Sequence, residues 1–214
     1  MLERDFKSKS WAERLDPFEA LISTILSQAT NDRNRDLALK NLKRKLKLTP
    51  QIISKTDAKD IADSIHPAGL ENMKAPRIKE AARIILEEYS GDLRKVLRLP
   101  QAEAREKLMD LPGVGFKTAD VMLAFVARRN VMPVDTHISR IAKRLGVVNE
   151  KAEYEEIRKT LEELIPAEKR LNIHLSMIAF GRKICKAPKP LCYRCRITRY
   201  CKWFIENVST VKAS

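Results

Sequence analysis

One stretch of twelve residues near the middle of the chain limits the possible folds most. It reads Leu-Pro-Gly-Val-Gly-Phe-Lys-Thr-Ala-Asp-Val-Met over residues 111–122, and it joins a glycine-rich turn to a very apolar segment. The segment 116–128 is apolar on nearly every side, as a helix in the centre of a protein is. The two glycines permit positive φ angles, which tight turns use. The stretch therefore predicts a hairpin that leads into a central buried helix.

The rest of the chain repeats apolar residues at helical spacing, and the alternation that is typical of strands is rare. Pro17 suits the first turn of a helix, and Gly146 suits the position just after one. Helices are expected over residues 17–28, 32–46, 73–89, 101–109, 116–128, 136–145, 151–164 and 167–184. The pattern predicts an all-α protein of roughly ten short helices.

The chain is strongly basic: its 214 residues include 42 Lys and Arg against 28 Asp and Glu, a formal net charge of +14. Such a charge favours a polyanionic partner. Charge alone does not separate DNA from RNA or from an acidic membrane, and thermophilic proteins are also rich in charged residues. Nucleic acid is the interpretation that we prefer. No secretory signal or membrane-spanning run is visible, so we expect an intracellular, cytoplasmic protein that is located with the DNA.

The hairpin at residues 111–115 can hold an anion. The amides of Gly113, Gly115 and the next residues would point outward at a helix N-terminus, an arrangement that binds a phosphate oxygen. Lys117 is expected on the first helical turn, where the helix dipole disfavours the ammonium form. Partial burial would act in the same direction and favour the free amine of a Schiff-base nucleophile. The alternatives are a hairpin that only permits a tight bend, and an exposed lysine that contacts a phosphate.

A second polar element, Val134-Asp135-Thr136-His137, follows the predicted central helix. Asp135 is a good N-cap for the next helix, which is its ordinary role. Its functional role would be a carboxylate that faces Lys117 across a cleft, where it takes a proton from the amine or stabilises a sugar cation. His137 is more often a packing or phosphate-contact residue than a catalyst.

All four cysteines lie within seventeen residues, with the spacing C-x6-C-x2-C-x5-C: Cys185, Cys192, Cys195 and Cys201. In a reducing compartment such a group indicates a metal centre. Zinc sites with four cysteines usually consist of two close pairs, and this loop has only one. A [4Fe–4S] cluster therefore fits slightly better than zinc, and two disulfides are a distant third interpretation.

The same region is cationic and contains no acidic residue between positions 182 and 202. A loop of this composition would grip a phosphate backbone. Its aromatic residues Tyr193, Tyr200 and Trp203 are expected to pack around the metal centre. The cations are Arg182, Lys183, Lys186, Lys189, Arg194, Arg196, Arg199 and Lys202.

Three motifs in this order resemble the endonuclease III family of helix–hairpin–helix DNA glycosylases: Leu-Pro-Gly-Val-Gly-Phe-Lys-Thr-Ala-Asp, Val-Asp-Thr-His and the cysteine loop. The resemblance runs from about residue 17 to residue 203. It implies a [4Fe–4S] cluster on the four cysteines, Lys117 as the Schiff-base nucleophile and Asp135 as its carboxylate partner. Residues 113, 115 and 137 fall where the family contacts DNA.

The resemblance also implies a domain arrangement. A six-helix barrel domain would comprise residues 19–130, with the helix–hairpin–helix motif at about 101–129. An iron–sulfur cluster domain would comprise residues 1–18 and 131–214, with the cluster loop at 185–201. A DNA-binding cleft would lie between the two domains.

Two further segments match the family. Leu-Ser-Gln-Ala-Thr at 26–30 resembles the stretch whose glutamine fills the gap left by a flipped base, and Gln28 has the donors and acceptors for that role. Gly-Leu-Glu-Asn at 69–72 resembles a wedge loop, which makes Leu70 the inserting side chain. The ordinary roles are a polar residue at a helix end for Gln28 and a core contact for Leu70.

These residues together predict a bifunctional glycosylase and abasic-site lyase of base excision repair. It would flip an oxidised pyrimidine out of double-stranded DNA and cleave the strand by β-elimination. We expect it to act as a monomer on DNA with damaged bases or abasic sites. The alternatives are a monofunctional mismatch glycosylase that removes adenine, thymine or uracil, and a non-catalytic helix–hairpin–helix DNA-binding protein. Lys117 counts against the first alternative, and the Lys117–Asp135 pair counts against the second.

Overall fold

The structure, a computed structural model, describes residues 15–209, which form helices and turns without any β-strand. These residues divide into two compact units. We call residues 15–129 the helical unit and residues 130–209 the C-terminal unit. The predicted all-α class is confirmed.

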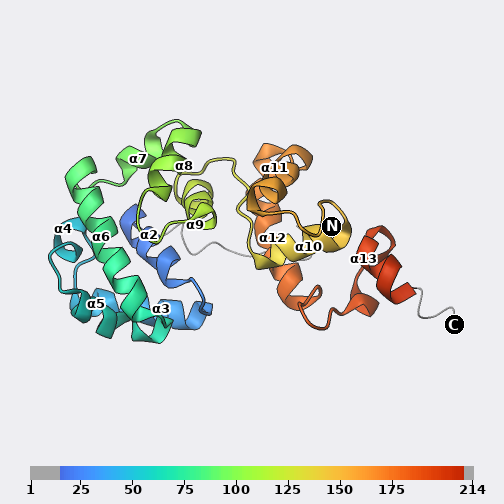
Figure 1. The fold of residues 1–214 in the computed structure, drawn as a ribbon, viewed down its shortest axis with the longest axis horizontal. Helices are drawn as coiled ribbons and strands as arrows, with labels where there is room; N and C mark the ends of the chain where they lie inside the picture. Colours follow the sequence, from blue (N-terminus) through green and yellow to red (C-terminus); the bar gives the residue numbers. More distant parts are fainter. Residues whose placement is uncertain (1–14, 210–214) are drawn as a thin grey trace. The chain divides into compact units, whose positions relative to one another are not determined.

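The helical unit is built from short helices and two helical turns, shown from blue to yellow-green in Figure 1. Its long helix α6 contacts α2, α4 and α5. In chain order its elements are α2 (Pro17–Leu26), α3 (Asp32–Lys45), α4 (Pro50–Ile53), α5 (Ala58–Ile65), the 3-10 turn η2 (His66–Ala68), α6 (Glu71–Tyr89), α7 (Arg94–Arg98), α8 (Gln101–Met109), α9 (Phe116–Val121) and the π-helical turn η3 (Met122–Val126).

Side-chain caps explain where several of these helices begin. Asp16 accepts a hydrogen bond from the amide of Phe18 at 3.0 Å, before Pro17 opens α2. Asn31 caps α3 and Asp57 caps α5 in the same way. Such caps satisfy amides that have no partner inside the helix. The starts of these helices are therefore fixed by local sequence.

The core of the helical unit consists of aliphatic side chains, and many of them are completely buried. The predicted central helix is part of it and has two sections, because the α-helical hydrogen bonding of α9 changes to π-helical at Met122. Arg128, with φ of 55°, follows this run. Side chains with no more than 1% exposure include Leu21, Ile22, Leu42, Ile53, Ile61, Ile65, Ile78, Ile85, Leu108, Met122 and Leu123.

The C-terminal unit has a smaller core. It is formed mainly by α10, α11 and α12, and it includes Ile138, Ile141 and Phe180. The elements of the unit are α10 (Thr136–Leu145), α11 (Tyr154–Leu164), the 3-10 turns η4 (Ala167–Lys169), η5 (Cys192–Arg194) and η6 (Thr198–Tyr200), α12 (Arg170–Lys183), α13 (Lys202–Phe204) and the π-helical turn η7 (Ile205–Ser209).

Four short helices were not expected from the sequence: α4, α5, α7 and α13. Residues 15–18 belong to the helical unit, where Arg94 forms an ion pair with Asp16 at 2.6 Å. Residues 1–14 lie outside the described part of the chain. The assignment of an N-terminal segment to the cluster domain therefore stays a prediction.

None of the helices between residues 15 and 209 combines the length and the apolar composition that a membrane-spanning segment needs.

Candidate functional site

The hairpin at residues 111–115 is anchored by its two apolar residues. Leu111 is 2% exposed and Val114 is 6% exposed, and the amide of Val114 donates to the carbonyl of Leu111 at 3.0 Å. Gly113 has φ of +85°, a left-handed conformation in which a side chain is strained. The backbone of the hairpin is thus held by the core while its outer edge stays accessible.

Gly115 lies at the accessible edge, immediately before α9. A Cβ atom placed on it would have no other atom within 4 Å, so the space in front of its backbone is open. Gly115 is the N-cap of α9 and provides no side-chain cap. The first amides of the helix therefore have no partner within the helix, and a phosphate oxygen could accept hydrogen bonds from them.

Lys117 is on the first turn of α9 and is exposed. The partial burial that the sequence suggested is therefore wrong for this structure. Burial falls instead on its neighbours Thr118, Ala119 and Asp120, because they face the core. Lys117 is thus on the exposed side of α9, where a large substrate has access.

The helix that carries Lys117 is fixed by a buried ion pair. Asp120 is fully buried, and Arg105 of α8 reaches it at 2.6 Å. The guanidinium of Arg105 also lies 5.2 Å from the ring centre of Phe116, a cation–π arrangement. These contacts join α8 and α9 behind the hairpin.

Gln28 lies just beyond the end of α2 and binds the hairpin. Its side-chain amide donates to the carbonyl of Gly113 at 2.8 Å and to Oγ1 of Thr118 at 3.3 Å. The next residue, Ala29, has φ of +54°, which is unusual for a residue with a side chain. The structure thus places Gln28 against the hairpin, although the two are 85 positions apart in the sequence.

Leu70 separates η2 from α6 and is 51% exposed. Its φ of 55° and that of Gly69, 67°, form a left-handed turn. A large apolar side chain that is half exposed on a strained turn is not a simple core contact. The alternative role for Leu70 that the sequence left open, packing in the core, is therefore wrong.

Lys74 is a further polar residue in this region, and sequence reasoning missed it. It lies in the first turns of α6 and is 1% exposed. Burial lowers the pKa of its ammonium group, and the nearby carboxylate of Glu71 opposes this effect. The signal in the sequence was a lysine in helical register with the buried residues Ile78 and Ala82.

Asp135 lies in the C-terminal unit, at the N-terminus of α10. Its side chain accepts a hydrogen bond from the amide of Ile138 at 2.8 Å, so the N-cap role is confirmed. The preceding residue, Val134, donates its amide to the hydroxyl of Tyr154 at 3.3 Å. A capping carboxylate has a second oxygen, and the half-buried Asp135 retains the capacity to accept a further proton or hydrogen bond.

His137 is on the first turn of α10 and packs against α12. Its Nδ1 accepts a hydrogen bond from Arg140 at 3.0 Å. Its side chain lies so close to Gly181 that a Cβ there would come within 2.8 Å of the His137 Cβ and 3.0 Å of Nδ1. Burial lowers the pKa of His137; Asp135 opposes this shift, and Arg140 and Arg182 add to it. These contacts support the packing role of His137.

The four cysteines line one apolar cavity in the C-terminal unit. All four have free thiols, which excludes the disulfide interpretation in this structure. Burial raises the pKa of the Cys192 and Cys195 thiols. Cys185 and Cys201 raise both pKa values further, while the backbone at Ile197 lowers that of Cys195 and Arg144 lowers that of Cys192. Over residues 15–209 no three His, Cys, Asp or Glu side chains are grouped closely enough to hold a metal ion.

Two arginines of α10 hold the cysteine loop. Arg144 donates to Sγ of Cys185 at 3.3 Å and to the carbonyl of Lys186 at 2.7 Å. Arg140 donates to the carbonyl of Cys185 at 2.9 Å. Arg144 also stacks on the ring of Trp203 at 4.9 Å. The helix that begins at Asp135 thus supports the loop at its other end.

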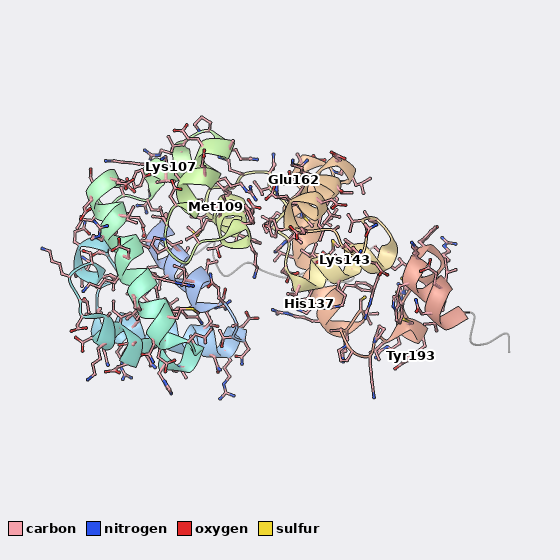
Figure 2. The ribbon with its side chains drawn as sticks, in the orientation of Figure 1. Lys107, Met109, His137, Lys143, Glu162 and Tyr193 are labelled. Carbon is pink, nitrogen blue, oxygen red and sulfur yellow. The ribbon has the colours of Figure 1, made fainter. Side chains whose placement is uncertain are left out.

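The aromatic residues of the loop divide into two kinds. Trp203 lines the cavity, as expected. Tyr193 is 84% exposed and is labelled in Figure 2, and Tyr200 is 63% exposed, so the expected packing of these two tyrosines is wrong. Neither tyrosine is among the residues that line the cavity. Tyr200 is covered on one face by Arg199, 4.6 Å from its ring centre.

Comparisons with known proteins agree with this fold. A profile of the HhH-GPD superfamily of base excision DNA repair proteins matches residues 22–167. The endonuclease III of Thermotoga maritima is 40% identical over 189 residues, which are 88% of this chain and 84% of that protein.

Two solved structures are also similar. A trapped endonuclease III–DNA covalent intermediate has a TM-score of 0.85 and 31% identity, and the match covers 96% of this chain and 92% of that one. A thermostable thymine-DNA glycosylase has a TM-score of 0.79 and 25% identity over the same shares of the two chains.

These findings define the class as an all-helical protein of base excision DNA repair. The chain belongs to the endonuclease III family of helix–hairpin–helix DNA glycosylases and abasic-site lyases.

Proposed function

We propose that this protein removes oxidised pyrimidines from double-stranded DNA and cleaves the strand at the resulting abasic site, with Lys117 as the nucleophile. The observation that carries the proposal is the position of Lys117, exposed on the first turn of α9 directly behind the open backbone of Gly115. A phosphate bound at the hairpin amides would place the adjacent sugar next to this amine. The similar structure of a trapped endonuclease III–DNA covalent intermediate supports this chemistry.

The reaction proceeds through a covalent intermediate. The free amine of Lys117 attacks C1′ of the flipped nucleotide, and the bond to the base breaks with its electron pair, which a proton then neutralises. Opening of the sugar ring gives an iminium that acidifies the C2′ proton. Loss of that proton expels the 3′ phosphate, and water then hydrolyses the iminium to release the amine.

Asp135 is the proposed carboxylate partner in this reaction. It accepts the proton that Lys117 loses on bonding to C1′, and its negative charge stabilises the sugar cation that develops. Its N-cap bond to the amide of Ile138 fixes the carboxylate at the start of α10. A carboxylate held in a fixed orientation can stabilise the positive charge that develops on the sugar.

The remaining proposed contacts hold the DNA. The amides at Gly113 and Gly115 bind a phosphate, which positions the strand without reading its sequence. Gln28 fills the space of the flipped base, and Leu70 inserts between bases on the opposite strand. The left-handed backbone at Ala29 and Leu70 supports both assignments, because strained residues are concentrated at functional sites. His137 is a further proposed DNA contact.

The four cysteines are proposed to hold a [4Fe–4S] cluster. They line a common cavity with apolar walls, which suits a cofactor held away from water. A single zinc ion would need all its sulfurs within about 2.3 Å of one point, whereas a cubane spreads its four ligand positions. A cluster of this kind would order a cationic loop that binds the DNA backbone. Iron and sulfide analysis of the purified protein tests this assignment, and a zinc-containing, colourless protein would contradict it.

Borohydride trapping tests the proposed nucleophile. We expect wild-type protein mixed with a duplex that contains an abasic site to form a stable covalent adduct, because borohydride reduces the iminium. Lys117→Ala should lose the adduct and the strand cleavage. The matched control is Lys107→Ala, which removes another exposed lysine of the helical unit (Figure 2). Absence of the wild-type adduct would refute the lyase, and an adduct in Lys117→Ala would assign the chemistry to another amine.

The similarity to a thymine-DNA glycosylase favours one alternative, a monofunctional mismatch glycosylase. The same assay separates the two functions. Release of thymine from a G·T duplex without a borohydride adduct would support the mismatch enzyme. Release of an oxidised pyrimidine together with an adduct supports the bifunctional enzyme.

A further inference from the structure

We propose that Lys74 is a positioning residue that holds the Gln28 segment and the Leu70 turn together, so that both can enter the DNA at a flipped nucleotide. The inference rests on the proposed function, because that function assigns the DNA-inserting roles to Gln28 and Leu70. Lys74 would itself touch neither the DNA nor the reacting atoms.

The ammonium group of Lys74 donates three hydrogen bonds to backbone carbonyls. The acceptors are Leu26 at 3.0 Å, Gln28 at 2.7 Å and Ala68 at 3.0 Å. An ammonium group has three donors, so each is used. Two of the acceptors, Leu26 and Gln28, lie at and beyond the end of α2, and the third, Ala68, lies in η2, at least 40 positions further along the chain. Lys74 therefore connects two segments that are far apart in the sequence.

Both of the connected segments have strained backbones. Gln28 precedes Ala29, with φ of 54°, and Ala68 is followed by Gly69 and Leu70, with φ of 67° and 55°. A left-handed residue with a side chain costs about 1–3 kcal/mol and persists only when its surroundings hold it. The bonds from Lys74 act directly next to both strained turns. These hydrogen bonds supply the restraint that keeps the two turns in their strained conformation.

Lys74 also holds the Leu70 turn from its other side. The backbone amide of Lys74 donates to the carbonyl of Leu70 at 2.8 Å, while its side chain binds Ala68 at 3.0 Å. Lys74 thus bonds to Ala68 through its side chain and to Leu70 itself through the first-turn backbone bond of α6. The side chain of Leu70 remains half exposed and free to project.

The hydrogen bonds around Lys74 also connect to the hairpin at residues 111–115. The side chain of Gln28 donates to the carbonyl of Gly113, while its own backbone carbonyl accepts from Lys74. The phosphate-binding hairpin, the gap-filling glutamine and the wedge turn therefore belong to one hydrogen-bonded network inside the helical unit. Its buried centre is the ammonium group of Lys74.

A buried charge is an inefficient way to stabilise a core, because desolvation offsets most of what its contacts contribute. An apolar residue of similar size at position 74 would pack beside Ala75 and Ile78 without that cost. It would leave three carbonyls without their charged donor. The presence of a buried ammonium group at position 74 is thus better explained by its effect on the conformation of the two turns than by its contribution to stability.

The test measures insertion separately from catalysis. The DNA is a duplex with a non-cleavable tetrahydrofuran abasic site opposite 2-aminopurine, and all proteins carry Lys117→Ala. Fluorescence anisotropy first sets a protein concentration that occupies all of the DNA. The 2-aminopurine fluorescence then reports how far the opposite base loses its stacking when Gln28 and Leu70 enter. The parent protein should give a clear change.

Lys74→Met keeps the length of the side chain and removes its donors. We expect the ratio of inserted to non-inserted complexes to fall about tenfold, which corresponds to a loss of about 1.4 kcal/mol. Lys59→Met is the matched control, because it removes the same charge from an exposed site on α5. It should keep the full fluorescence change.

A double mutant distinguishes positioning from loss of stability. If Lys74 acts through Gln28, then Gln28→Ala should remove much of the effect of Lys74→Met, so that the two losses are less than additive in free energy. Fully additive losses would overturn the proposal. If Lys74→Met does not fold, Lys74→Gln, which keeps two donors, takes its place in the same measurements.

Each remaining outcome decides the question. A full fluorescence change in Lys74→Met or Lys74→Gln at complete occupancy would overturn the proposal, and so would the absence of any change in the parent protein. Borohydride trapping with proteins that retain Lys117 reports the nucleophile separately. A protein that forms the adduct but shows no effect of Lys74 leaves the proposed function standing and removes this inference alone.

Discussion

The helical unit and the cysteine loop at residues 185–201 are built in different ways. The helical unit has a continuous aliphatic core, and the side chains of Ile61, Ile65 and Ile85 in it are completely buried. Between residues 182 and 208 no side chain is buried. The loop consists of 3-10 turns that are tied to α10 by Arg140 and Arg144.

This difference separates two ways of holding a site. In the helical unit, buried side chains and hydrogen bonds of the unit itself hold the hairpin, Gln28 and the Leu70 turn. The loop has too little apolar surface to compensate for the entropy of ordering its backbone. A metal centre on the four cysteines, as proposed above, would supply the missing stability. The following predictions test this contrast, from the largest expected effect to the smallest.

Loss of one cysteine should unfold the loop and leave the helical unit intact. In Cys192→Ala, we expect the protection of the loop amides against hydrogen exchange to fall nearly to that of an unfolded chain, because their local stability depends on the metal centre. Amides of α2, α6 and α9 should keep their protection. Hydrogen exchange read by mass spectrometry measures both regions in one experiment.

Thr198→Ala is the control, because it changes a loop residue that is not a proposed ligand. Unfolding of both units in Cys192→Ala would show that the helical unit also depends on the cysteines. Unchanged protection in the loop would show that the arginines of α10 suffice to hold it.

Truncation of one isoleucine in each region should give a moderate difference in the free energy of unfolding. Ile61→Ala empties a completely buried position of the helical unit and should lower the free energy of unfolding by about 2–5 kcal/mol. Ile205→Ala, at a position that is 49% exposed beside the loop, should change it by no more than about 0.5 kcal/mol. Urea unfolding followed by circular dichroism measures both. Equal losses would contradict the contrast between the two regions.

A small pH effect should be confined to the C-terminal unit. Burial holds the pKa of His137 below 6.5, and Asp135, Arg140 and Arg182 are the charged groups around it. The unfolded state therefore takes up a proton more readily than the folded state as the pH falls through 6.5, and acid destabilises the unit. His137→Gln should make the free energy of unfolding less dependent on pH just below 6.5. An unchanged pH profile would exclude His137 as the source.

Sequence patterns predicted most of the longer helices and missed the shortest ones. The helices at 101–109 and 136–145 have the bounds that the sequence indicated. α5 spans only 8 residues, although its buried side chains Ile61, Ala62 and Ile65 lie at helical spacing. The N-cap residue Asp57 could have indicated where α5 begins. Helices as short as α4 and α7 form because the core that they cover is present.

The candidate site was predictable only in part. Local motifs indicated the hairpin, Lys117, Asp135 and the cysteines as candidates, because each motif carries its chemistry within a few residues. The role of Lys74 depends on carbonyls at positions 26, 28 and 68. A lysine on the apolar side of α6 was visible, but its partners were not. Likewise, exposure of Lys117 depends on how α9 packs and not on the residues beside it.

The sequence by itself determined the all-helical class, the tight turn at Gly113 and the grouping of the cysteines, because each depends on backbone preferences or on spacing along the chain. The tertiary structure decided which groups meet. It brought Gln28 to the hairpin and the Lys74 ammonium to the turns beside Gln28 and Leu70. Such contacts arise from packing between distant segments, which local residue patterns do not specify.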